Sequence, residues 1–172
     1  MHLRFIFGFA VAFALVLGTA QANQVVITIN KVSQKMTVTV DGEREFVWPV
    51  STGAAGYTTP SGSFHPFRME EEHFSKEWDD APMPHSIFFT GEGHAIHGSL
   101  HVKSLGRRAS HGCVRLAPDN AAKLFALVQE AGMKNTTVII RGGLFDSGFV
   151  EVERAKYNKF KQKKQKWWES IN

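Results

Sequence analysis

The stretch Ser110-His111-Gly112-Cys113-Val114-Arg115-Leu116 contains the only cysteine of the 172-residue chain, and His97-Gly98 begins sixteen positions before that cysteine. A structural cysteine is usually a buried, inert and apolar side chain. Here its neighbours are small or polar, and Gly112 allows the backbone to approach a ligand closely. A thiol accompanied by histidine is the residue set of nucleophilic catalysis. We therefore predict that Cys113 is a nucleophile and that His97 is its general base.

The pattern from His97 to Leu116 resembles the signature of the L,D-transpeptidases of bacterial cell walls, the YkuD-type catalytic domain. Two upstream segments, Pro49-Val50-Ser51-Thr52-Gly53 and Thr59-Pro60-Ser61-Gly62-Ser63-Phe64, are similar to flanking motifs of that family and occur in the same order. The resemblance covers about residues 24–141. It implies a β-sandwich with one packed amphipathic helix, and an enzyme that needs neither a metal nor an organic cofactor.

The resemblance also implies roles for individual residues. The family assigns the base to a histidine at the position of His97. The partner of its other ring nitrogen is, by resemblance, the carbonyl of Gly98 or a contribution from Ser110, and the sequence does not choose between them. We expect the backbone N–H groups of Gly112 and Cys113 to form the oxyanion site.

His111 and Arg115 each have two interpretations. His111 is either the base itself or a substrate-binding or supporting residue. On an extended segment, it would point to the same side as Cys113 but be poorly placed to bond the sulfur, so we favour the second role. Arg115 shares that parity, and either clamps a substrate carboxylate with its planar guanidinium or forms a surface salt bridge.

In the resembling family the acyl donor is a peptidoglycan stem tetrapeptide, from which D-alanine leaves. The acyl group then passes to an amine of a second stem (a 3-3 cross-link), of a D-amino acid or of an envelope protein. Water as the acceptor gives an L,D-carboxypeptidase or amidase on the same fold. The sequence leaves the acceptor open.

Two other classes of function compete with the thiol enzyme. A zinc-dependent hydrolase would use a cluster of histidines and the cysteine, which are donors that zinc accepts. These donors are His94, His97, His101, His111 and Cys113. Histidines that alternate along strands rarely converge without further ligands, so we do not favour it. A wall-binding module without catalysis is the other class.

The first residues are typical of a secretory signal peptide. His2 and Arg4 precede the apolar run from Phe5 to Leu17, and Ala20-Gln21-Ala22 is a small-x-small cleavage site. The run is too short to span a bilayer well, although an uncleaved anchor is the alternative. We therefore predict a signal peptide over residues 1–22 and a protein exported to the periplasm or cell wall.

The charge of the chain is uneven. Its net charge is +4, and residues 153–172 alone carry +5. The exported body is slightly acidic, so a nucleic-acid partner is not expected. We predict a catalytic domain over residues 23–142 and a basic helical tail over 143–172. That tail either packs Trp167-Trp168 on the domain or contacts anionic wall polymer or a membrane surface.

Hydrophobic periodicity predicts a mainly β (α+β) domain with a single helix. The helix begins around Ala117-Pro118 and stops at Gly132. The segment 70–84 carries six acidic residues against Lys76 and two prolines. We interpret it as a long loop with room for a short helix, which is either a solvated face or an active-site lid. Strands are expected over residues 24–30, 36–40, 45–51, 85–90, 94–97 and 136–141.

Overall fold

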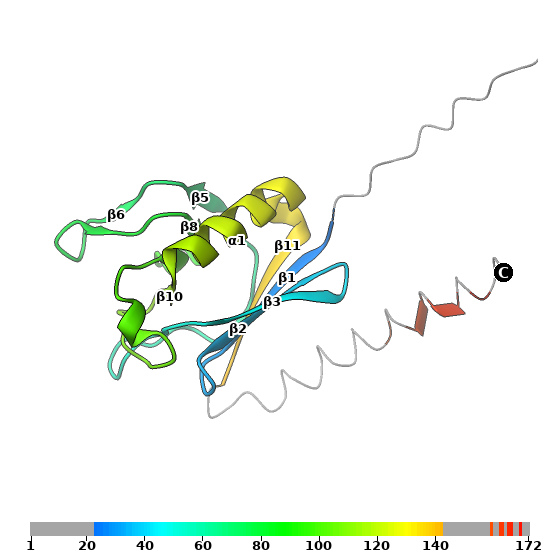
Figure 1. The fold of residues 1–172 in the computed structure, drawn as a ribbon, viewed down its shortest axis with the longest axis horizontal. Helices are drawn as coiled ribbons and strands as arrows, with labels where there is room; N and C mark the ends of the chain where they lie inside the picture. Colours follow the sequence, from blue (N-terminus) through cyan, green and yellow to red (C-terminus); the bar gives the residue numbers. More distant parts are fainter. Residues whose placement is uncertain (1–22, 143–158, 160–161, 164, 167–168, 170–172) are drawn as a thin grey trace, which may run out of the picture.

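A five-stranded sheet forms the larger layer of the domain (Figure 1). The structure is a computed structural model that describes residues 23–142, 159, 162–163, 165–166 and 169. In spatial order the strands are β3 (Glu43–Pro49), β2 (Lys35–Val40), β1 (Val25–Asn30), β11 (Thr136–Arg141) and β4 (Gly62–Phe64). The β1 strand pairs antiparallel with β2 and parallel with β11. The first and last strands of the domain therefore lie side by side at the centre of this sheet.

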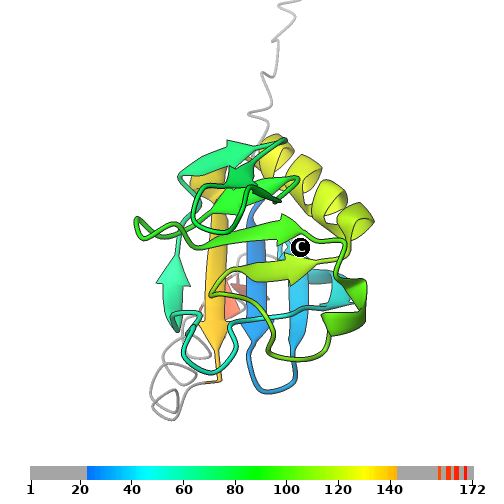
Figure 2. The same ribbon diagram turned by 90° about the vertical axis from the view of Figure 1, so that its left-hand side faces the viewer.

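A second, four-stranded sheet lies in front of the first, and its strands cross those of the larger sheet in Figure 2. Its strands are short. In spatial order they are β10 (Val114–Leu116), β9 (Ala95–Gly98), β8 (Ser86–Phe88) and β5 (Arg68–Glu70). The β10 and β9 strands run parallel, whereas β9 pairs antiparallel with β8 and β8 with β5.

The two sheets share one hydrophobic core. Alternate residues of β1 are buried, as expected for a strand with one face against a core, whereas β8 and β9 are buried at every residue. The core contains Ile27 and Val38 from the larger sheet and Ile96 and Val114 from the smaller one. The prediction of a mainly β domain is confirmed.

The long helix within residues 23–142, α1 (Pro118–Ala131), packs against β9, β8 and β1. Pro118 occupies the first turn, where its missing N–H costs nothing, and Gly132 ends the helix at φ +85°. Leu124 and Val128 are fully buried on the core side. The predicted helix is therefore confirmed, with the expected start and stop. Two short 3-10 helices also occur, η1 (Val102–Ser104) and η2 (Met133–Asn135).

The acidic segment over residues 70–84 forms a small hairpin. Its two strands are β6 (Phe74–Ser75) and β7 (Ala81–Pro82), which pair antiparallel. Asp79 and Asp80 adopt left-handed φ values of 47° and 48°, and they close the turn that joins β6 to β7. The short helix allowed for here is wrong, because these left-handed residues and the flanking prolines favour a turn.

The strand expected over residues 85–90 is shorter than predicted, because His85 has φ of 55° and β8 covers only Ser86–Phe88. The predicted signal peptide lies outside the described residues. So does most of the basic tail, whose six described positions are helical and exposed. No helix among the described residues is long and apolar enough to cross a bilayer.

Candidate active site

The register between β9 and β10 decides which side chains meet. Val114 lies opposite Ile96, and Arg115 lies opposite His97. Ile96 and Val114 both point into the core. Because side chains alternate along a strand, His97 and Arg115 lie on the opposite, outer face of the sheet.

Cys113 directly precedes β10 and joins that outer face. Its side chain is partly buried and packs against Met83, Phe88 and Ala95, a cluster separate from the main core. Cys113 packs against Ala95, which lies two positions before His97 along β9 and on the same face of that strand. The thiol and the imidazole that the sequence singled out therefore lie diagonally on one face of one sheet.

The His97 ring is held by its own strand. Its Nδ1 lies 2.7 Å from the Gly98 carbonyl oxygen, so Nδ1–H donates there and Nε2 is the basic nitrogen. The ring is 6% exposed. This burial lowers the pKa of His97 from 6.5 to about 4; the Gly98 hydrogen bond opposes the shift, and the charges of Arg115 and His73 add to it. His97 is therefore neutral at pH 7.

Burial also raises the pKa of the Cys113 thiol. The Ala95 backbone hydrogen bond and the charge of Arg115 oppose this shift, and the charge of Glu77 adds to it. A raised thiol pKa beside a lowered imidazole pKa makes the neutral thiol and neutral imidazole the resting forms. Such a pair must transfer its proton during attack on a substrate rather than hold a stored thiolate.

The turn before Cys113 is held by a buried hydroxyl. Ser110 Oγ donates to the Cys113 carbonyl oxygen at 2.5 Å and accepts from the Gly112 N–H at 3.2 Å. Ser110 therefore shapes the turn, whereas the Gly98 carbonyl binds the His97 ring. The Gly112 N–H, expected as an oxyanion donor, is engaged by Ser110.

Gly112 itself has φ of +116°, a conformation that favours glycine. A Cβ there would lie 3.1 Å from His94 Nε2. Residues 110–113 therefore bend rather than run extended. The extended segment that the parity argument for His111 assumed is therefore not present.

His111 instead contacts the acidic hairpin. Its ring stacks on Trp78 with centroids 3.7 Å apart and 7° between planes, and Tyr57 meets it edge-on at 4.7 Å. This aromatic cluster joins the turn before the thiol to the segment predicted as a loop or lid. No periodic pattern along the chain indicates this cluster, because its three residues come from three different loops.

Arg115 is half-buried and donates from Nη1 to the Ala109 carbonyl oxygen at 3.1 Å. Within the described part of the chain it forms no salt bridge. Its guanidinium shares the outer face with Cys113 and His97.

Thr59 begins the upstream Thr59–Phe64 motif, and no role for it follows from the sequence alone. Its side chain is 1% exposed, donates from Oγ1 to the Gly112 carbonyl oxygen at 2.7 Å and accepts from the Gly53 N–H at 2.9 Å. Gly53 is itself a bridge partner of Ser110. A Cβ on Gly53 would lie 1.6 Å from the Tyr57 carbonyl oxygen, so this close approach requires glycine.

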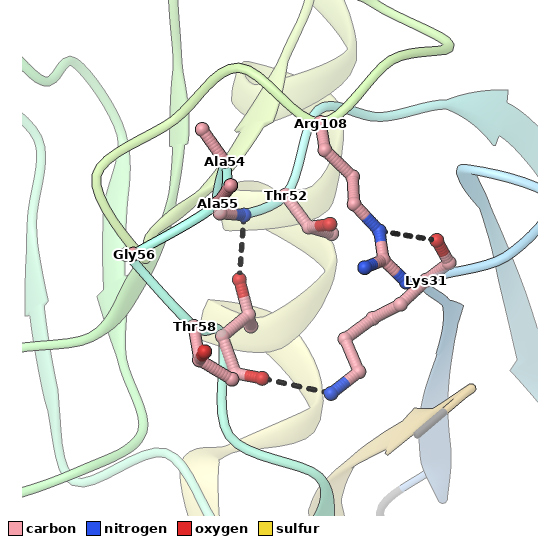
Figure 3. A pocket seen from close by; sticks show the side chains of 9 residues that line it. Lys31, Thr52, Ala54, Ala55, Gly56, Thr58 and Arg108 are labelled. Atoms are coloured by element: carbon pink, nitrogen blue, oxygen red, sulfur yellow. Dashed lines mark hydrogen bonds between the residues drawn. The ribbon is translucent and has the colours of Figure 1, made fainter. Parts of the chain in front are cut away.

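A cavity of about 110 Å³ lies behind this turn (Figure 3). Lys31 and Arg108 reach it from one side, and the backbone of residues 54–58 passes along the other. Lys31 Nζ donates to the Thr59 carbonyl oxygen at 2.9 Å, and Arg108 Nε donates to the Lys31 carbonyl oxygen at 3.2 Å. The cavity wall is thus tied to the segment that carries Thr59.

The histidines do not converge as a zinc site would require. No group of three or more His, Cys, Asp or Glu side chains in the described ranges is placed to hold a metal ion. His94 is held by Thr90, whose Oγ1 lies 2.8 Å from its Nδ1, and its Nε2 faces Gly112.

The fold and the site define a mainly β domain with a cysteine and a histidine on one sheet face. The profile of the YkuD family, the L,D-transpeptidase catalytic domain, matches residues 24–140. The chain belongs to this family of cysteine enzymes, which act on peptidoglycan peptides. The family resemblance of the motifs between Pro49 and Leu116 is confirmed.

Three similar proteins support the assignment. The Bacillus subtilis protein YqjB is 27% identical over 114 residues, which are 59% of this chain and 65% of that protein. An L,D-transpeptidase structure from Mycobacterium smegmatis is 26% identical with a TM-score of 0.64, over 70% of this chain and 59% of that one. The structure of LdtMt1 in complex with imipenem is 25% identical with a TM-score of 0.62, and the match covers 69% of this chain and 59% of that one. This chain covers less than two thirds of each.

Proposed function

We propose that the protein is an exported L,D-transpeptidase that acts on peptidoglycan stem tetrapeptides through an acyl-enzyme on Cys113. The observation that carries the proposal is the shared outer face of β9 and β10. On it a neutral imidazole, fixed through Nδ1, lies diagonally from a neutral thiol. The family's action on wall peptides supports a location outside the cytoplasmic membrane.

In the first half-reaction Cys113 Sγ attacks the carbonyl carbon of the bond between the L-configured centre and the terminal D-alanine. His97 Nε2 takes the thiol proton, and the Gly98 carbonyl stabilises the imidazolium through Nδ1–H. The carbonyl oxygen becomes an oxyanion, for which the Cys113 N–H is the candidate donor. The C–N bond then breaks, and the D-alanine amine leaves with the proton from His97.

The second half-reaction runs in the reverse sense. An acceptor amine attacks the thioester, His97 removes a proton from it, and the thiolate leaves and is protonated. Arg115, on the same face, is proposed to bind a substrate carboxylate. His111, packed between Trp78 and Tyr57, is proposed to support the turn and line the substrate path. The amine belongs to a second stem, a D-amino acid or an envelope protein, and water in its place gives the carboxypeptidase.

The test is acylation by imipenem, the ligand named for one of the similar structures. We expect intact-protein mass spectrometry to show one adduct, located on Cys113 by peptide mapping and lost in Cys113→Ser. Folded wild-type protein without an adduct would contradict the proposal. Muropeptide analysis after incubation with tetrapeptides separates the acceptors, since cross-linked or exchanged products indicate transfer and tripeptides alone indicate hydrolysis.

A further inference from the structure

We propose that Thr59 is a positioning residue that aims the oxyanion-binding N–H of Cys113. The inference deepens the proposed function and rests on it. Its starting point is the buried hydroxyl of Thr59, which lies on a segment more than fifty residues from the nucleophile in the sequence. That hydroxyl donates to the carbonyl of the residue directly before the nucleophile.

The geometry of one peptide bond links that hydrogen bond to catalysis. The Gly112 carbonyl and the Cys113 N–H belong to the same peptide unit. In a trans peptide these two groups point in opposite directions, and the chain contains no cis peptide among its described residues. Holding the Gly112 oxygen against the buried Thr59 therefore turns the Cys113 N–H away from Thr59.

The other three backbone N–H and C=O groups of Gly112 and Cys113 have hydrogen-bond partners within the turn, so the Cys113 N–H is the candidate oxyanion donor. Ser110 Oγ engages both the Gly112 N–H and the Cys113 carbonyl, and Thr59 Oγ1 engages the Gly112 carbonyl. The fourth polar backbone group of these two residues is the Cys113 N–H. Gly112 at φ +116° has no Cβ to limit rotation of the peptide, so hydrogen bonds must fix its orientation.

Thr59 is itself held in place on both sides. Its hydroxyl accepts from the Gly53 N–H, and the neighbouring Ala54 N–H donates to the Ser110 carbonyl at 2.9 Å. Its own carbonyl accepts from Lys31 Nζ across the cavity of Figure 3. The Thr59 hydroxyl is therefore held in one position, from which it can orient the Gly112–Cys113 peptide.

The experiment compares two reactions of the same thiol. Acylation by imipenem develops an oxyanion, whereas alkylation by iodoacetamide displaces iodide and develops none. In Thr59→Val, which keeps the shape but removes the hydroxyl, we expect acylation to slow by about 10- to 100-fold. Alkylation should stay within about twofold of the wild-type rate, because the thiol environment is unchanged. A purely structural defect would slow or accelerate both reactions together.

Two variants serve as controls. Thr59→Ser keeps the hydroxyl and should restore acylation to within about threefold of the wild type. Thr52→Val removes another buried threonine hydroxyl from the same cavity wall, but one that bonds Gln34 Nε2 rather than the turn. It should acylate at the wild-type rate. Normal acylation in folded Thr59→Val, or equal losses in Thr52→Val and Thr59→Val, would overturn the inference.

A second measurement does not depend on how Thr59→Val folds. In a crystal structure of the wild-type imipenem adduct, the thioester carbonyl oxygen should accept from the Cys113 N–H while Thr59 Oγ1 remains bonded to Gly112. An oxygen bound elsewhere would overturn the inference and leave the acyl-enzyme intact. A wild type that alkylates but does not acylate would instead contradict the proposed function.

Discussion

The two sheets of the domain differ in strand length and in what their outer faces carry. In the five-stranded sheet, four strands have six or seven residues, and β1 pairs along its whole length with both β2 and β11. In the four-stranded sheet no strand exceeds four residues, and the outer face holds His97, Cys113 and Arg115. Long strands supply burial and regular hydrogen bonds, whereas short strands bring several loops to one place. Changes in the two sheets should therefore affect different properties.

The largest effect is expected for His97→Gln in the smaller sheet. Removing the base should slow imipenem acylation by about 10³-fold, within the usual range for general bases. His65→Gln is the matched control, because His65 follows β4 of the larger sheet and its Nδ1 also lies within 2.8 Å of a backbone carbonyl, that of Thr136. Stopped-flow measurement of the acylation rate in both variants should show a loss only in His97→Gln. Similar losses for both would remove the distinction between the sheets.

The converse change is Ile27→Ala in the larger sheet. Ile27 is fully buried in the core, so truncation should lower the free energy of unfolding by about 2–5 kcal/mol. The acylation rate per folded molecule should be unchanged. Denaturant titration measures the first quantity, and Val26→Ala, on the less buried face of the same strand, should cost much less. A slowed acylation in folded Ile27→Ala would contradict the separation.

Acid should destabilise the protein through the smaller sheet. The unfolded His97 ring takes up a proton near pH 6.5 and the native ring only near pH 4, so the unfolded state binds more protons between these values. The free energy of unfolding should then fall by about 3 kcal/mol as pH decreases from 6.5 to 4. Urea titrations at several pH values measure this, with His97→Gln as the control that loses this component. An equally steep fall in the variant would assign the pH dependence to other groups.

The smallest effect is expected for Trp78→Ala in the acidic hairpin. Loss of its stacking on His111 should lower the local stability of residues 74–82 by about 1 kcal/mol, without changing the global free energy of unfolding. Hydrogen exchange resolved by segment measures both. Phe74→Ala is the control, because Phe74 is more than half exposed in the same hairpin. Equal protection in wild type and Trp78→Ala would show that the stacking does not hold the hairpin.

The larger sheet was the easier half to predict from the sequence. Its central strands β1 and β11 are rich in β-branched residues over six positions, and α1, which packs against β1, has a proline at its start and a glycine at its end. Strand patterning and caps therefore identified these three elements, whereas the three-residue β4 was not expected. Periodicity does not specify partners, however. The parallel pairing of β1 with β11 joins residues over a hundred positions apart and left no local signal.

The sequence indicates the residue types of the site better than its hydrogen bonds, of which it offered one, from His97 to the Gly98 carbonyl, as one of two alternatives. A unique cysteine sixteen residues after a histidine is visible in the sequence, as is the glycine before it. Which oxygen holds the His97 ring depends on a backbone carbonyl, and every residue has one. Thr59 and Trp78 reach the turn through space, and no spacing along the chain indicates such contacts.

The parallel partnership of the first and last strands has a consequence for biosynthesis. Until Thr136–Arg141 has been made, β1 has β2 on one side and a bare edge on the other. The central ladder can therefore close only after almost the whole domain has been translated, and pairings so distant along the chain form slowly. Premature termination before Thr136 would leave the unpaired edge available to other chains.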